Sequence, residues 1–226
     1  MTKPTLTHQD FIDAAALLNC SVAAIQAVAE VESSGAGFLD TGEPKILFER
    51  HIFSSRTNRL YDNTNPGVSN RIAGGYGKYN AQHKRLQEAV VLDRNAALMS
   101  ASWGKFQIMG FNYALAGFNS LQEFVNAMFR SERDHLIAFI HYIKNVFLDD
   151  ELREMRWADF ARKYNGPAYQ KNKYDTKLAA AYSKFAGSSR SLKTTGLRAV
   201  KKTSDNPERL FKRIKKRAMA DMPNYF

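Results

Sequence analysis

The residue with the clearest capacity for chemistry is Glu32, a carboxylic acid on the apolar side of a predicted helix. The apolar stripe of this helix recurs at helical spacing and leads to Glu32 at the last turn; it consists of Val22, Ile25, Val28 and Ala29. A carboxyl group that loses hydration is harder to ionise, so its pKa rises toward neutrality, as a general acid requires. The alternative is a half-buried glutamate paired with an arginine, and this stretch alone does not separate the two interpretations.

The helix that carries Glu32 has clear predicted ends. Ser21 is a typical N-cap, and Gly35 and Gly37 favour termination after about three turns. An earlier helix is predicted to follow Thr7, which forms a capping box with the acidic residue three positions later. Two short helices therefore open the chain.

Beyond residue 40 the pattern changes twice. Residues 43–53 alternate over a short span and predict an extended segment with room for a small strand or hairpin. Residues 54–79 are rich in Asn, Gly, Ser and Tyr without a clear period, which predicts a long irregular segment that shapes a binding site. Helical patterning returns over 82–102, and Ser120 with Glu123 forms a second capping box.

The later part of the body is predicted to be helical as well. Residues 135–148 are apolar on a wide arc, which predicts a buried central helix. Two further helices, over 157–164 and 169–185, are separated by the break Asn-Gly-Pro at 165–167. The sequence thus predicts a mainly α fold with a small β element, in a catalytic domain spanning 1–186.

Composition limits the classes of protein that remain. The 226 residues, 44% of them hydrophobic, suffice for one domain with an appendage, and no apolar run is long enough to span a membrane. The N-terminus lacks a charged-then-apolar secretory signal. The lone Cys20 is expected to be a buried, inert thiol, and no histidine has metal-ligand spacing, so we expect no metal and no cofactor.

Charge is concentrated at the C-terminal end. The chain carries +11, and residues 187–226 hold eleven Lys and Arg against three acids, a net +8. This asymmetry predicts a near-neutral body with a basic tail that meets an anionic partner. Within the tail, an amphipathic helix is predicted near 207–220, suited to an anionic membrane or lipopolysaccharide; the alternative is a solvated tail that aids solubility.

A different class of function, non-catalytic nucleic-acid binding, also suits a basic chain. The basic residues are not interleaved through the body, however, and the chain has no signature of a nucleic-acid-binding fold. We therefore expect no nucleic-acid partner.

Three separated segments carry a resemblance to known enzymes. They are Glu-Ser-Ser-Gly at 32–35, Gly-Lys-Phe-Gln-Ile at 104–108, and Tyr-Asn-Gly at 164–166. An ordered trio of this kind is similar to that of goose-type lysozymes and soluble lytic transglycosylases, within the lysozyme-like superfamily. The segment Ile-Leu-Phe-Glu-Arg-His-Ile-Phe at 46–53 extends the resemblance to the N-acetylmuramidase family of phage endolysins. The similarity covers about residues 11–185.

This resemblance implies a lysozyme-like fold and cleavage of the β-1,4 bond between N-acetylmuramic acid and N-acetylglucosamine in peptidoglycan. Glu32 would be the acid that protonates the leaving oxygen. Gln107 and Asn165 would hold acetamido and hydroxyl groups of the sugar, and Tyr164 would hydrogen-bond Glu32. Ser33 joins the predicted substrate-binding set through the same motif. The alternative for Gln107, Tyr164 and Asn165 is loop architecture.

The resemblance also points to Glu49 as a second catalytic carboxylate, a base that activates water, with Asp40 in reserve. His51 would orient Glu49 or pack beside it. The alternative role of Glu49 is an ion pair with an arginine, for which the candidates are Arg50, Arg56 and Arg71. A lytic transglycosylase would need no such base, because the muramyl 6-hydroxyl attacks internally and gives an anhydro product. We further expect a monomer that stays in the host cytoplasm until a separate pore releases it to the cell wall.

Overall fold

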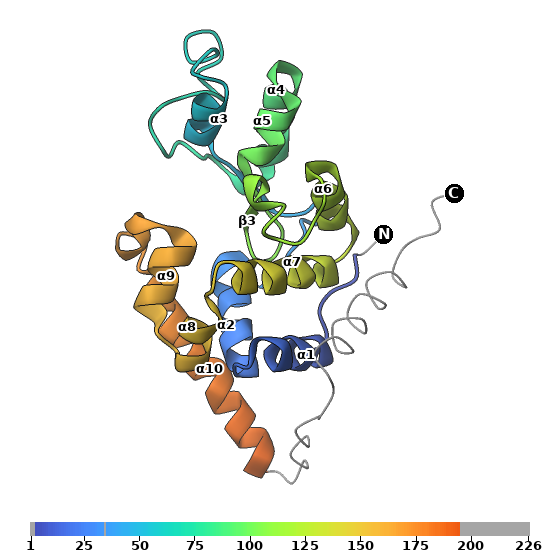
Figure 1. Ribbon diagram of the computed structural model, residues 1–226, viewed down its shortest axis with the longest axis vertical. Helices are drawn as coiled ribbons and strands as arrows, with labels where there is room; N and C mark the ends of the chain where they lie inside the picture. Colours follow the sequence, from blue (N-terminus) through green and yellow to red (C-terminus); the bar gives the residue numbers. More distant parts are fainter. Residues whose placement is uncertain (1–2, 34, 195–226) are drawn as a thin grey trace, which may run out of the picture.

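The computed structural model describes residues 3–33 and 35–194, which form a mainly helical body around the buried helix α7 (Figure 1). The helices are α1 (His8–Leu18), α2 (Val22–Ser33), α3 (Arg50–Arg56), α4 (Gln82–Leu92), α5 (Arg94–Met99), α6 (Leu121–Arg130), α7 (Glu132–Asn145), α8 (Asp149–Glu154), α9 (Trp157–Asn165) and α10 (Tyr174–Thr194). The strands are β1 (Ile46–Phe48), β2 (Ala101–Trp103) and β3 (Ile108–Met109). The predicted mainly α, lysozyme-like class with a small β element is confirmed.

The first two helices begin and end as predicted. The Thr7 amide donates to the Asp10 carboxylate at 2.8 Å, and the Asp10 amide donates back to the Thr7 hydroxyl at 3.4 Å, completing the capping box of α1. The Ala24 amide donates to Ser21 Oγ at 3.2 Å at the start of α2. Gly35 follows the end of α2 with a φ of +87°, a conformation that glycine adopts without steric cost.

The three strands form one antiparallel sheet in the order β1, β2, β3. Ile46 pairs with Trp103 and Phe48 with Ala101, so the sheet joins two segments more than fifty residues apart. One prediction was too simple here. Residues 50–56 are helical rather than extended, because Phe53 and Thr57 turn inward at helical spacing.

The predicted helix over 82–102 was also too simple, because the range forms two helices, α4 and α5, and part of strand β2. Asp93 breaks it by capping α5, where its carboxylate accepts the Ala96 amide at 2.9 Å. The final residues of the range belong to strand β2, because pairing with β1 and β3 outweighs the helical preference of Ala and Ser.

The central helix α7 is buried over most of its length, as predicted. Leu136, Phe139, Ile140 and Ile143 are fully buried. The predicted helix extended to residue 148, but α7 ends at Asn145, and Phe147 beyond it is 79% exposed. The predicted capping box of α6 is only half formed: Ser120 Oγ accepts the Glu123 amide, while the Glu123 carboxylate accepts the Asn119 amide instead.

The C-terminal helix α10 packs against α2 and α9 and runs through the predicted domain boundary at 186 to Thr194. The rest of the tail, with the helix predicted near 207–220, lies outside the described residues. Among residues 3–33 and 35–194, no single helix is long and apolar enough to cross a membrane. Helices α1 and α2 reach that length and apolarity only when they are taken together, and the chain bends by 111° between them.

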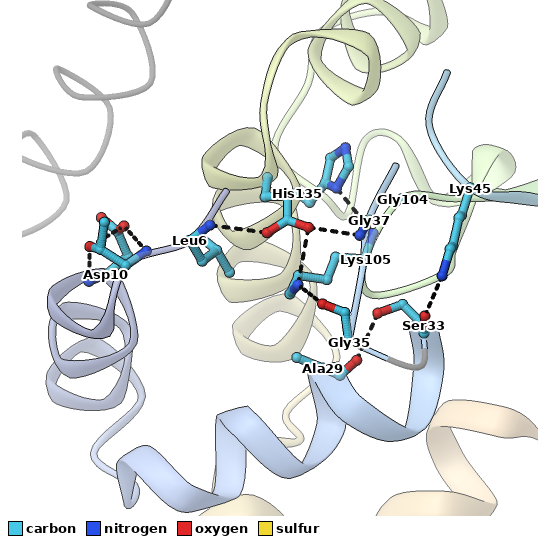
Figure 2. Close-up of polar contacts among 12 residues, drawn as sticks. Leu6, Asp10, Ala29, Ser33, Gly35, Gly37, Lys45, Gly104, Lys105 and His135 are labelled. Atoms are coloured by element: carbon cyan, nitrogen blue, oxygen red, sulfur yellow. Dashed lines mark hydrogen bonds and ion pairs between the residues drawn. The ribbon is translucent and has the colours of Figure 1, made fainter. Parts of the chain in front are cut away.

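A buried ion pair joins the segments around α7 (Figure 2). Lys105 Nζ lies 3.0 Å from Glu132 Oε1, with 7% and 3% of the two side chains exposed. The same carboxylate accepts the Gly37 amide at 2.7 Å and the Leu6 amide at 3.0 Å, and Lys105 Nζ also donates to the Gly35 carbonyl. One salt bridge therefore ties the end of α2, the N-terminal segment and the β2–β3 turn to α7.

Replacing Lys105 by Met should destabilise the fold by about 3–5 kcal/mol, because the Glu132 carboxylate would stay buried without its cation. Equilibrium urea unfolding measures this change. The matched control is Arg162→Met, which removes an exposed ion pair with Asp159 and should cost less than about 1 kcal/mol.

The double variant Lys105→Met, Glu132→Gln separates the effect of an unpaired buried charge from the effect of a changed side-chain volume. Its amide oxygen can accept only one of the two backbone N–H groups, from Leu6 or from Gly37, but no buried charge is left without a partner, so it should lose less stability than Lys105→Met alone. A Lys105→Met variant within about 1 kcal/mol of the parent would contradict the structural role of the pair.

Candidate active site

Glu32 lies in the last turn of α2 with its side chain partly buried. Burial raises the pKa of the Glu32 carboxyl to about 7, against smaller opposing effects from the Asn165 hydrogen bond and the Lys177 charge. The carboxyl oxygen Oε1 accepts a hydrogen bond from Asn165 Nδ2 at 2.8 Å. The partner is thus an amide, not the arginine of the alternative interpretation, and the group is an acid that holds its proton near neutral pH.

Asn165 reaches Glu32 from the C-terminal end of α9, and Gly166 follows with a φ of +81°. Tyr164, one residue earlier, has a different partner from the one predicted: its hydroxyl donates to the Phe106 carbonyl at 2.6 Å rather than to Glu32. Its ring stacks on Phe160, 5.1 Å between centroids. Burial, and next the charge of Glu32, raise the pKa of Tyr164 well above its usual value, so this phenol stays neutral beside the acid.

Gln107 is committed to its own loop. Its Oε1 accepts Ser102 Oγ at 2.8 Å, and its Nε2 donates to the Gly104 carbonyl at 2.8 Å and the Lys45 carbonyl at 3.3 Å. The backbone at Gln107 has a φ of +47°. These bonds match the loop-architecture alternative, because both ends of the amide hold the β2–β3 turn against the segment before β1.

Ser33 also points away from the acid. Ser33 is 4% exposed, and its hydroxyl donates to the Ala29 carbonyl at 2.8 Å, one turn back along α2. Its own carbonyl accepts Lys45 Nζ at 2.8 Å (Figure 2). The contribution of Ser33 is therefore to the end of the helix that presents Glu32.

The second carboxylate, Glu49, is the N-cap residue of α3. Its Oε2 lies 3.1 Å from His51 Nδ1, and both atoms are buried without a hydrogen bond of regular geometry, so His51 packs beside the carboxylate. Burial raises the pKa of Glu49, while the His51 charge and a hydrogen bond from Tyr76 act in the opposite direction. Asp40, the reserve candidate, is exposed.

None of the three arginines considered as partners of Glu49 takes that role in the described chain. Arg50 donates to the Gly74 and Pro66 carbonyls, at 3.0 and 3.1 Å. Arg56 lies over the Phe111 ring, and Arg71 pairs with Asp62 at 3.4 Å. The ion-pair alternative for Glu49 therefore fails, and its carboxylate faces His51 and Tyr76.

A family model of N-acetylmuramidases matches residues 21–186, which include both glutamates. The chain belongs to the N-acetylmuramidase family. It is therefore a glycoside hydrolase of the lysozyme type that acts on peptidoglycan. Among solved structures, the crystal structure of Burkholderia AP3 phage endolysin is similar, with 39% identity and a TM-score of 0.74 over 83% of this chain and 73% of that one. No curated protein gave a match.

Three tyrosines that accompany the two carboxylates of this muramidase were not among the residues predicted for the site. Burial and the charges of both glutamates, that of Glu32 first, raise the pKa of Tyr174 to about 12. After burial, the charge of Glu32 raises the pKa of Tyr79, and the charge of Glu49 raises the pKa of Tyr76. Glu32 and Glu49 thus act on one common group although they lie on different elements. For Tyr76 and Tyr79, the signal in the sequence was the tyrosine content of residues 54–79; Tyr174 lies outside that segment.

The loop that carries Tyr76 and Tyr79 is anchored by the buried Gln82. Its Oε1 accepts the Phe48 amide at 3.0 Å, and its Nε2 donates to the Tyr76 carbonyl and, at 3.2 Å, to the Lys78 carbonyl. The first of these bonds is to strand β1, directly before Glu49. The irregular segment is therefore held in place beside the second carboxylate.

Replacing Glu32 by Gln should stabilise the folded enzyme at high pH. A folded-state pKa of about 7, against 4.5 for the free group, means that the folded protein binds the extra proton, so stability falls as pH rises from 4.5 to 7 and is then level. Glutamine removes this penalty, which amounts to at most about 3 kcal/mol.

Urea unfolding at about pH 4 and pH 8 measures the effect: the gain from Glu32→Gln should be present at the higher pH and vanish at the lower one. Glu30→Gln on the same helix removes an exposed ion pair with Lys184 and serves as the control, with a change below about 1 kcal/mol at both values. An equal effect of Glu32→Gln at both pH values would contradict the raised pKa.

Proposed function

We propose that this chain is a phage endolysin in which Glu32 is the general acid and Glu49 the general base of glycosidic cleavage. The observation that carries the proposal is the partly buried Glu32 carboxyl, with a pKa of about 7 and an amide partner. The bond cleaved is the β-1,4 linkage from N-acetylmuramic acid to N-acetylglucosamine.

In the proposed reaction, protonated Glu32 gives its proton to the glycosidic oxygen as the bond to the muramyl anomeric carbon breaks. The Glu32 carboxylate that results is stabilised by the Asn165 N–H group already directed at it. Glu49 takes a proton from the water that attacks the anomeric carbon, and His51 and Tyr76 lie beside its carboxylate. Neutral Tyr164 supports the site through the Phe106 carbonyl.

Mass spectrometry of fragments released from purified peptidoglycan tests both assignments. The parent should release fragments with reducing muramic ends. Glu32→Gln should lose activity by several orders of magnitude because it has no proton to donate, and Glu49→Gln should be strongly slowed. Glu30→Gln is the matched control on α2.

Two results would change the proposal in different ways. Activity of Glu32→Gln within about tenfold of the parent would remove Glu32 from the role of acid. Anhydro ends from the parent, together with a nearly active Glu49→Gln, would instead identify a lytic transglycosylase.

We also propose that the basic C-terminal segment draws the enzyme to an anionic membrane surface or lipopolysaccharide. Support comes from the net charge of +8 over residues 187–226 and from the apolar positions recurring at helical spacing near 207–220. The near-neutral body would then carry the chemistry and the tail the surface attraction.

A truncation after residue 194, which keeps α10 whole, should lower lysis of intact Gram-negative cells relative to cleavage of soluble wall fragments. A full-length variant with Lys212, Arg213, Lys215, Lys216 and Arg217 changed to Gln is the matched control for charge. The advantage of the parent should shrink as salt rises from about 0.05 to 0.5 M, because screening shortens the reach of the charges. Equal lysis by parent and truncated enzyme at low salt would contradict the role of the tail.

A further inference from the structure

A polar pocket of about 450 Å³ opens beside the second carboxylate, between α3 and the loop that follows it. It is lined by His51, Ser54, Ser55, Asn58, Arg59 and Arg71. The lining holds two guanidinium groups and several hydrogen-bonding side chains but no carboxylate. Its volume lies in the range of sites that take a small ligand.

The pocket adjoins the catalytic centre through His51. One nitrogen of this ring, Nδ1, lies 3.1 Å from the Glu49 carboxylate, and the same residue lines the pocket. His51 is therefore the residue that the pocket and the surroundings of Glu49 have in common.

The two arginines are held differently. Arg71 Nε lies 3.4 Å from Asp62 Oδ2, while 68% of its side chain stays exposed, and Ser69 fixes the other oxygen of Asp62 at 2.6 Å. Within the part of the chain that the structure describes, Arg59 has no ion-pair partner. The charge of Arg71 is thus balanced by Asp62, and the charge of Arg59 is available to a ligand.

The backbone that presents Arg59 is unusual. Asn58 and Arg59 both have left-handed φ values, 51° and 66°, a conformation that residues other than glycine and asparagine rarely adopt. The Arg59 amide donates to the Ser54 carbonyl at 2.7 Å and holds this conformation. Strain of this kind is maintained where surrounding contacts fix a side chain in a needed direction.

We propose that this pocket binds the carboxylate-bearing peptide stem of peptidoglycan. The inference rests on the proposed function, since the stem is attached to the same muramic acid residue whose anomeric carbon Glu49 would serve. Peptide carboxylates suit the arginines, and peptide amides suit the serine and asparagine side chains. The muramidase would then bind the peptide stem as well as the glycan strand.

Kinetics on two substrates tests the proposal. Glycan strands are used with their peptide stems or after an amidase has removed them, and the ratio of kcat/KM between the two is measured for each variant. Arg59→Gln should lower this preference for stem-bearing glycan by about tenfold, the size of one charge-assisted hydrogen bond. Arg59→Lys should keep most of it, and Arg94→Gln, an exposed arginine on α5 bonded to Gln122, should keep all of it.

Direct binding separates this inference from the proposed chemistry. The full-length Glu32→Gln variant is titrated with the tripeptide L-Ala-γ-D-Glu-meso-diaminopimelate or with inorganic phosphate, and amide shifts of residues 51–59 are followed by NMR. Saturable shifts with the tripeptide, weakened about tenfold by Arg59→Gln, support the inference even if the proposed roles of the glutamates fail. No shifts with the tripeptide, equal shifts with phosphate, or an unchanged substrate preference in Arg59→Gln would overturn it while leaving the catalytic roles intact.

Discussion

The buried ion pair of Lys105 and Glu132 is the interaction on which the rest of this muramidase depends. Both charges are removed from water, and such a pair is stable only when hydrogen bonds satisfy its remaining polar atoms. Those bonds come from the backbone of Leu6 in the N-terminal segment and of Gly35 and Gly37 after α2. The pair therefore fixes where α2 ends and where the β2–β3 turn lies, and with them the position of Glu32.

Burial and loop contacts have different roles in this site. Burial keeps the Glu32 carboxyl protonated, which costs stability above pH 4.5 and gives the enzyme an acid at neutral pH. Loop contacts, through Gln82 and Arg50, hold a tyrosine-rich segment beside Glu49. Tyr174 on α10 lies within electrostatic reach of both carboxylates, so three elements distant in sequence share one site.

Local physics explains what could be predicted from the sequence. The capping box of α1, the glycine stop after α2 and the apolar arc of α7 depend on neighbours within a turn, so spacing alone was sufficient. Glu32 as an acid followed from its place on an apolar stripe, and Glu49 with His51 from a segment shared with a known family. The 50–56 helix and the β2 strand were missed, because period-two and helical patterns cannot be told apart over a few residues.

By itself, then, the sequence determined the mainly helical class, the family and the two candidate carboxylates. Only the tertiary structure decided the partners of each polar group. Tyr164 bonds the Phe106 carbonyl, Gln107 and Ser33 support backbone turns, and Asn165 alone of the predicted amides meets Glu32. The reason is physical: a hydrogen bond is made over about 3 Å in space, and its partner here lies as far as 133 residues away along the chain.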